Sequence, residues 1–223
     1  MMPGRIARSS APIRFARAIR LSRLSRHICT IPKESGCMAK RQSALAANYH
    51  RGLHGRPGEP GVRLQEVPDL NLYQMSAWPE TLGTVGTTVA QAIGSSKTPR
   101  PGEVICGEKG SALRVEALKW WLLDVEPSPL DAETGVTLDI SHSRTRILVS
   151  GPEASACLNR LLPTDLRQDR FVVNQVASGG IHHVGITLWR SEAGYELFIP
   201  RGFAESLWEL LIETAEQFGL EIV

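Results

Sequence analysis

GYELFIPRGFAESLWELLIETAEQFG, residues 194–219, carries the most regular pattern of the chain. It predicts a strand that ends at Pro200, a turn through Arg201 and Gly202, and one long amphipathic helix. A helix this apolar on one face needs a sheet on which to pack. The apolar residues of the helix recur every three or four positions, as expected for one buried face: Phe203, Leu207, Trp208, Leu211, Ile212, Ala215 and Phe218.

The sequence before this helix supplies strands for such a sheet. Residues 62–67 and 70–78 have the composition and alternation of strands, and a helix is predicted from Pro79 to Gly94. Residues 112–125 contain the nearly continuous apolar run ALKWWLLDV, which favours a single buried strand. These elements form a first predicted unit, residues 62–134.

A second predicted unit, residues 135–223, repeats the combination of strands and helices. Alternating residues predict a strand at 136–140, and another strand follows it. Residues Ser150–Glu153 have the S-x-x-E spacing of a capping box, which predicts the start of a helix. Two strands flank Gly179–Gly180. The expected fold is α+β, with two small sheet-and-helix units and ferredoxin-like pairing.

Charge is distributed unevenly along the 223 residues. Residues 1–60 hold 12 Lys or Arg and 2 acidic residues, whereas residues 61–223 hold 13 Lys or Arg and 21 acidic residues. Phosphate binding needs clustered positive charge, and the cations of the second part are scattered among carboxylates. The expected folded part is therefore not a nucleic-acid-binding protein.

Residues 1–61 are expected to be a basic, disordered N-terminal arm or an upstream extension. Residues 1–37 are Arg-rich and nearly free of acidic residues, as in an organelle transit peptide. The alternative is that Met38 is the true start. Residues 39–61 are polar and rich in Gly and Pro, which is typical of a mobile linker. On this interpretation the fold starts near Val62.

Cysteine use and hydropathy indicate a cytoplasmic, soluble protein. Cys29, Cys37, Cys106 and Cys157 form neither a CxxC pair nor a disulfide framework, which fits a reducing compartment. No apolar run approaches the roughly 20 residues that a membrane-spanning helix needs. We therefore expect no membrane association.

Two groups of polar residues contain the elements of a catalytic or metal site. Asp139, Ser141 and His142 have the side chains of a triad, but on a strand the Ser141 and His142 side chains point to opposite faces. His182 and His183 are also adjacent and have no Cys, Asp or Glu at ligand spacing. We therefore expect no catalytic and no metal-binding residues.

A third segment, CGEKG at residues 106–110, contains glycines as nucleotide-binding loops do. It lacks both the glycine spacing of a dinucleotide-binding loop and the Lys-Ser/Thr ending of a phosphate-binding loop. It is predicted to be a hairpin turn. No cofactor-binding residues are expected in this chain.

Tryptophan and arginine residues are the candidates for contact with a partner. Trp120 and Trp121 are neighbours on one predicted strand, so their side chains face opposite sides of it. Core packing is the first interpretation of the tryptophans, and an interface anchor is the alternative. Arginines beside apolar strands suit recognition of a carboxylate on a partner. The candidate interface residues are Arg144, Arg146, Arg201 and Trp208.

Two stretches resemble the gamma subunit family of heterotetrameric sarcosine oxidase: DISHSRTRILVSGPEASACLNRLLPTDL, residues 139–166, and FIPRGFAESLWELLIETAEQFG, residues 198–219. The resemblance extends over about residues 62–219. Gly202 departs from the family pattern, where Ser usually caps the helix, and so does Arg167, where His often follows the Asp-Leu pair. Glycine is also tolerated at a cap, so the departure at Gly202 leaves the expected fold unchanged.

The resemblance implies a fold similar to that of folate-binding aminomethyltransferases. Related enzymes carry an acidic residue shortly after a Gly-Gly-Ile segment, whereas this chain reads GGIHHV at residues 179–184. The resemblance therefore implies an accessory subunit of an oxidoreductase complex, with no catalytic residues of its own. The alternative is a free-standing folate-binding protein or aminomethyltransferase-like enzyme.

The same resemblance implies what the partners would hold. Larger subunits, the alpha subunit above all, would bind FAD, FMN, NAD and tetrahydrofolate, and this chain would pack on them. The complex would demethylate sarcosine or a related N-methyl amino acid. The methyl carbon would pass to tetrahydrofolate or leave as formaldehyde.

Overall fold

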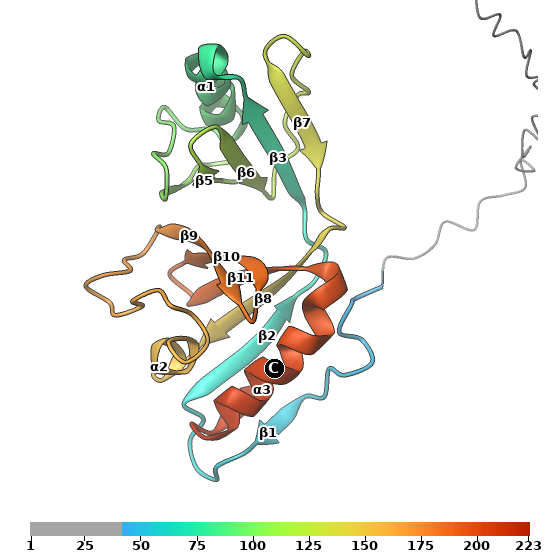
Figure 1. The fold of residues 1–223 in the computed structure, drawn as a ribbon, viewed down its shortest axis with the longest axis vertical. Coiled ribbons are helices and arrows are strands. Elements are labelled where there is room, and N and C mark those ends of the chain that lie inside the picture. The colour runs from blue at the N-terminus through green and yellow to red at the C-terminus, as the bar shows by residue number, and fades with distance from the viewer. Residues whose placement is uncertain (1–41) are drawn as a thin grey trace, which may run out of the picture. The chain divides into compact units, whose positions relative to one another are not determined.

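The computed structural model describes residues 42–223. Both interpretations of residues 1–37, a transit peptide and an upstream extension, fall outside the described residues. The described residues all belong to one compact unit. It contains a larger sheet of seven strands and a smaller sheet of five strands, each with helices on one face (Figure 1).

The larger sheet brings both ends of the described chain together. Its neighbouring strands are antiparallel except for one parallel pair, the last strand and the strand at Val62–Val67. In spatial order the strands are β1 (Gly52–His54), β12 (Leu220–Ile222), β2 (Val62–Val67), β8 (Arg144–Ser150), β11 (Tyr195–Pro200), β10 (Val184–Arg190) and β9 (Val176–Ile181).

Two helices cover one face of the larger sheet, and α3 is the one that the opening pattern predicts. The 3₁₀ turn η2 (Arg201–Phe203) leads from β11 into α3 (Ala204–Glu216), and α2 (Ala154–Leu158) follows β8. The buried side chains of both helices form one core cluster with those of the strands beneath them. Phe203 alone departs from the predicted apolar face: it is exposed because it lies in η2, before the helix begins.

The smaller sheet is antiparallel throughout. Helix α1 (Leu82–Ala92), preceded by the 3₁₀ turn η1 (Pro79–Thr81), packs on one face of it against Met75, Trp120 and Leu122. In spatial order the strands are β4 (Val104–Cys106), β5 (Ser111–Glu116), β6 (Lys119–Leu123), β3 (Leu72–Ala77) and β7 (Gly135–Asp139).

The other face of the smaller sheet packs in part against the larger sheet. Trp121 of β6 meets Phe198 of β11 edge to face, with ring centroids 5.8 Å apart. Both residues belong to a buried cluster that draws side chains from both sheets. Trp120 and Trp121 therefore face opposite sides of β6, and both are buried in the core, as the first interpretation predicted.

The predicted α+β class is confirmed, but the sheets divide the chain differently from the predicted units. Strand β2 lies in the larger sheet although it belongs to the predicted unit 62–134. Strand β7 lies in the smaller sheet although it belongs to the predicted unit 135–223. The hydrophobic pattern identifies strands, whereas their partners depend on contacts that are remote in sequence.

The predicted single strand at 112–125 is wrong. The segment forms a hairpin in which β5 and β6 are joined at Ala117–Leu118 and bend with a register shift between Leu113 and Glu116. Glu116 and Lys119 flank the turn and form an ion pair of 2.7 Å. The turn contains none of the Gly, Asn, Asp or Pro residues that usually mark one.

The predicted capping box at Ser150–Glu153 is also absent. The Glu153 N–H donates to the carbonyl oxygen of Gly61 (2.9 Å), and no side chain caps α2. Gly151 lets the chain pass this point, since it has a φ of 104° and a Cβ there would lie 2.5 Å from the same carbonyl oxygen. A backbone carbonyl just before β2 thus replaces the expected side-chain cap.

The described part of the predicted mobile arm, residues 42–61, belongs to the fold. Leu45 is completely buried, and the Tyr49 ring stacks on Trp208 with centroids 5.3 Å apart. Strand β1 adds an edge to the larger sheet by pairing with β12. The segment looks polar in sequence because β1 is an exposed edge strand and only a few side chains turn inward.

Candidate partner-binding site

Three of the four candidate interface residues line one pocket. Arg144 and Arg146 project from the same face of β8, since they are two residues apart. Pro200 of β11 pairs with Arg144, which brings the following residue, Arg201, beside the start of β8. The register of β8 and β11 therefore brings Arg201 beside Arg144 and Arg146, although it is more than 50 positions away in the sequence.

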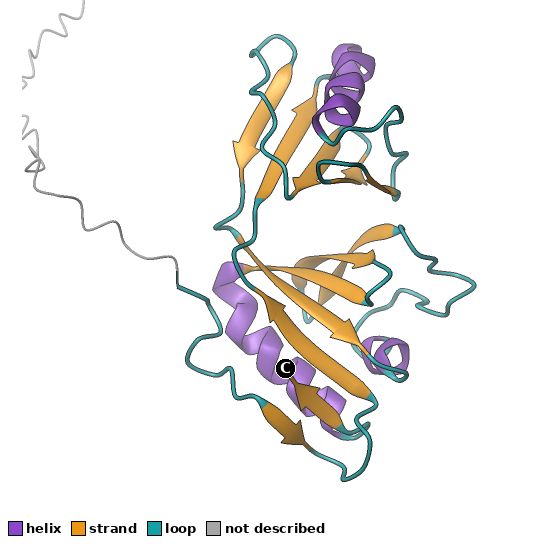
Figure 2. Cartoon of the chain, turned by 180° about the vertical axis from the view of Figure 1, so that it is seen from behind, coloured by secondary structure: helices purple, strands orange, loops and turns teal. Residues whose placement is uncertain are grey.

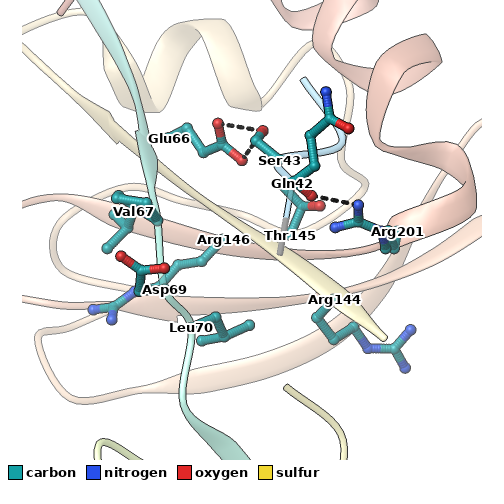
Figure 3. Close-up of a pocket in the computed structure, with 11 residues that line it drawn as sticks. Gln42, Ser43, Glu66, Val67, Asp69, Leu70, Arg144, Thr145, Arg146 and Arg201 are labelled. Atoms are coloured by element: carbon teal, nitrogen blue, oxygen red, sulfur yellow. Dashed lines mark hydrogen bonds between the residues drawn. The ribbon is translucent and has the colours of Figure 1, made fainter. Parts of the chain in front are cut away.

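The pocket has a volume of about 120 Å³. It is smaller than the roughly 300 Å³ at which small-molecule sites begin, so it suits a single side chain better than a cofactor. Figure 3 shows its walls, which come from β8, the end of β2 and the segment at Gln42–Ser43. The remaining lining residues are Glu66, Val67, Pro68, Asp69, Leu70 and Thr145.

Two of the three arginines form hydrogen bonds with groups of the same chain. Arg201 donates from Nη2 to the carbonyl oxygen of Gln42 at 2.5 Å. Arg146 donates from Nε to the carboxylate of Glu196 at 2.5 Å, and its Nη1 lies 3.8 Å from Asp124. The Arg146–Glu196 pair is mostly buried, so Arg146 neutralises a carboxylate inside the fold.

Arg144 differs from the other two because no ion pair to it is found within residues 42–223. Its guanidinium lies over the Trp121 ring, 5.5 Å from the centroid. Its Nε is buried and has no hydrogen-bond partner. Partial burial lowers the pKa of this guanidinium through desolvation. Arg144 is thus the cation of the pocket best placed to receive a carboxylate from outside the described chain.

Trp208, the fourth candidate, lies away from any exposed surface. Its side chain has 0% exposure, and its Nε1 donates to the carbonyl oxygen of Asn48 at 3.2 Å. The core interpretation of Trp208 is confirmed. A side chain without exposed surface cannot touch a partner while residues 45–49 cover it.

The Asp139–Ser141–His142 segment uses its polar groups for local structure. Residues 141–143 form a turn, not the strand that was expected. The Ser141 Oγ accepts from the Leu72 N–H (2.9 Å), and Asp139 Oδ1 accepts from the Ser141 N–H (2.9 Å). His142 is exposed. These bonds fasten the turn after β7 to the start of β3.

The remaining polar motifs lie in hairpin turns. His182 and His183 form the exposed two-residue turn between β9 and β10, with φ values of 45° and 68° that are typical of a type I′ turn. Residues 106–110 join β4 and β5, so the predicted hairpin turn is confirmed. Within the part of the chain that the structure describes, no cluster of three metal-ligating side chains is found.

Two partners of the arginines were missed from the sequence. Glu196 stands in the apolar run YELFIP, and a carboxylate in a buried strand requires a cation nearby, so this residue gave a usable signal. Trp121 gave none, because its contact with Arg144 depends on how the two sheets pack.

Comparisons with known proteins show the family to which this fold belongs. The pattern of the GCVT N-terminal domain matches residues 112–223, half of the chain. The chain belongs to this family. No helix of the GCVT-family chain within residues 42–223 is long and apolar enough to span a membrane.

Relatives of the GCVT-family chain fall into two groups. Sarcosine oxidase subunit gamma of Corynebacterium sp. (strain U-96) is 28% identical over 172 residues, which cover 73% of this chain and 83% of the relative. Sarcosine oxidase subunit gamma of an Arthrobacter species is 26% identical, and the match covers 71% of this chain and 82% of the relative. Aminomethyltransferase of Thermoanaerobacter pseudethanolicus is 34% identical over 86 residues, but these cover 37% of this chain and 23% of the relative.

A solved structure of heterotetrameric sarcosine oxidase from Corynebacterium sp. U-96, in complex with pyrrole 2-carboxylate, contains a chain with a similar fold. The TM-score is 0.66 at 27% identity, and the similarity covers 80% of this chain and 96% of that chain. The resemblance to the sarcosine oxidase gamma subunit family is confirmed.

Proposed function

We propose that this chain is the non-catalytic gamma subunit of a sarcosine oxidase-type heterotetramer, which oxidatively demethylates sarcosine or a related N-methyl amino acid. The extent of the similarities carries this proposal. Gamma subunits match along more than four fifths of their own length, whereas the aminomethyltransferase matches along less than a quarter. The chain thus has the span of a gamma subunit.

Tetrahydrofolate is the cofactor that the resemblance to folate-binding aminomethyltransferases implies. The segment at residues 179–184, GGIHHV, offers no carboxylate, and its two histidines form an exposed turn. A neutral imidazole cannot take the part of an ionised acid. These residues do not fit the cofactor, so we assign tetrahydrofolate, together with FAD, FMN and NAD, to the partner subunits.

The arginine pocket is the surface that we propose for assembly, with the alpha subunit as the partner. Arg146 and Arg201 hold the pocket in shape through Glu196 and the carbonyl of Gln42. Arg144 offers its guanidinium to an acidic side chain, and planar guanidinium groups bind carboxylates well.

Purification from the native source tests the proposal. We expect the chain to elute with larger, flavin-bearing chains that oxidise sarcosine. We also expect the chain alone to be colourless and to show no saturable tetrahydrofolate binding by calorimetry. Elution alone, together with tight folate binding and aminomethyl transfer by the isolated chain, would establish a free-standing folate enzyme instead.

A further inference from the structure

One half-face of the smaller sheet is left open by the rest of the described chain. Helix α1 covers the opposite face, and β7 forms an outer edge in both views (Figures 1 and 2). Gln74 pairs with Leu138 and Ser76 pairs with Val136, so these four side chains share the face that α1 does not cover. Trp78 continues the alternation of β3. We name these five residues the β7 face.

The β7 face is more apolar than an ordinary exposed surface. Trp78, Val136 and Leu138 have exposures of 45%, 37% and 48%. Eight large hydrophobic residues are exposed within residues 42–223, and three of them lie here. Gathered apolar residues on a sheet face mark an interaction surface more strongly than scattered ones do. Strand β7 also pairs with only one strand in the described chain.

A cation borders this apolar surface. Gln74 of the β7 face lines a pocket of about 220 Å³ together with Trp121, Lys119 and Arg144, so the Arg144 side chain lies at a cavity that begins at the edge of the β7 face. Lys119 already pairs with Glu116. Within residues 42–223 no carboxylate pairs with Arg144, and the ring beneath it removes part of its hydration.

Arg114, on β5 of the smaller sheet, provides a contrast with Arg144. Its guanidinium also lies over a tryptophan, 4.8 Å from the Trp120 centroid, and its Nε is also buried without a partner. Its terminal nitrogens, however, donate to the carbonyl oxygens of Pro99 (3.3 Å) and Ala117 (2.5 Å). Arg144 has no such bonds in the described chain. A carboxylate from another chain would complete its hydrogen bonding.

We infer that a segment of a larger partner subunit covers the β7 face, with apolar side chains on Trp78, Val136 and Leu138 and with an Asp or Glu carboxylate paired to Arg144. This inference rests on the proposed function and extends the proposed assembly surface from Arg144 of the arginine pocket to the β7 face, and it names the chemistry of the segment that would bind there. Charge and hydrophobic contact act together here, since the apolar contact excludes water from the ion pair.

The first experiment tests the apolar contact with Leu138→Asp. The probe is the remainder of the native complex, immobilised after this chain has been removed from it, and binding of the full chain is measured. We expect Leu138→Asp to weaken binding by about tenfold or more. Val172→Asp is the matched control, because Val172 is 51% exposed in the loop before β9, on the larger sheet. We expect it to bind like wild type.

The second experiment tests the carboxylate. Arg144→Gln should weaken binding by about tenfold at low salt, and Arg144→Lys should keep part of the affinity. Added salt should weaken wild-type binding more than it weakens binding of Arg144→Gln. Thermal unfolding of each isolated variant should match wild type, which separates a binding defect from a folding defect.

The outcomes separate this inference from the function on which it rests. If wild type does not bind the remaining subunits, the proposed function fails. If wild type binds and Leu138→Asp binds equally well, the inference about the β7 face is overturned while the function stands. An unchanged affinity of Arg144→Gln would overturn the ion pair. Self-association of the chain that Leu138→Asp abolishes would make a second copy the occupant and overturn the inference.

Discussion

Trp208 shows how one side chain ties the segment at residues 48–49 to helix α3. It lies on α3, stacks against Tyr49 and donates a hydrogen bond to the carbonyl of Asn48. Trp208→Ala should lower the free energy of unfolding by about 3–5 kcal/mol, because it leaves a cavity and removes that bond. Denaturant unfolding of the isolated chain measures the loss.

Phe203→Ala is the control for this change, since Phe203 is an exposed aromatic residue of the same region. We expect it to alter stability by less than about 0.5 kcal/mol. An unchanged unfolding midpoint for Trp208→Ala, combined with lost partner binding, would contradict the core assignment.

Asp165 offers a second test at the scale of one residue. The Arg167 guanidinium bonds to its carboxylate at 2.6 Å and holds the pKa of Asp165 at about 2. Because this pKa lies below the unfolded value of about 3.8, the pair stabilises the fold above that value and ceases to do so as the pH falls toward 2. In an NMR titration, Arg167→Ala should raise the pKa of Asp165.

The exposed position of this pair limits its effect on stability. Both side chains lie at the surface, where ion pairs contribute little, so we expect the titration to shift clearly while the melting temperature changes little. A pKa of about 2 that persists in Arg167→Ala would show that the Asp165 carboxylate is held by its backbone contacts instead.

At the scale of elements, the segment before β2 makes the sharpest prediction. A chain that starts at Met38 should fold as the full chain does, whereas a chain that starts at Val62 should be markedly less stable. The second truncation removes the buried Leu45, the ring that stacks on Trp208, and β1. Thermal unfolding of the two truncated chains makes the comparison. Equal melting temperatures would show that residues 42–61 add nothing to the core.

Periodicity predicted the elements whose environment is local. The α3 helix was readable because its buried face repeats along its own sequence, and the turn at residues 106–110 because glycines mark it. The turn at Ala117–Leu118 was missed, since no turn residue marks it. The capping box was predicted wrongly for another reason: the Glu153 N–H donates to the backbone carbonyl oxygen of Gly61.

The candidate site was predictable in its residues but not in its geometry. Arginines beside apolar strands suggested a partner surface. The pocket that gathers them, however, depends on the pairing of Pro200 with Arg144, which no local pattern encodes. The exposure of the β7 face could not be predicted from the sequence for the same reason. Val136 and Leu138 look like core residues in an alternating strand, and only the strand order shows that nothing in the described chain covers them.

For the whole molecule, Phe198 links the two sheets. It lies on β11 of the larger sheet, is completely buried, and meets Trp121 of the smaller sheet. Phe198→Ala should lower the free energy of unfolding by about 3–5 kcal/mol. Far-UV and near-UV circular dichroism during denaturation should report one shared transition if the sheets still unfold together. If the far-UV and near-UV signals of Phe198→Ala had different midpoints, and one of them stayed at the wild-type midpoint, the sheets would unfold independently.

The placement of β12 between β1 and β2 has a consequence for biosynthesis. Arg63 and Glu221 pair across this junction although they are 158 positions apart. As the ribosome extends the chain, β1 and β2 emerge long before the strand that joins them, so one side of β2 stays without its neighbour during translation. Such remote pairing slows folding and leaves a strand edge open to aggregation. Chaperone capture of nascent chains should therefore end only when β12 has emerged.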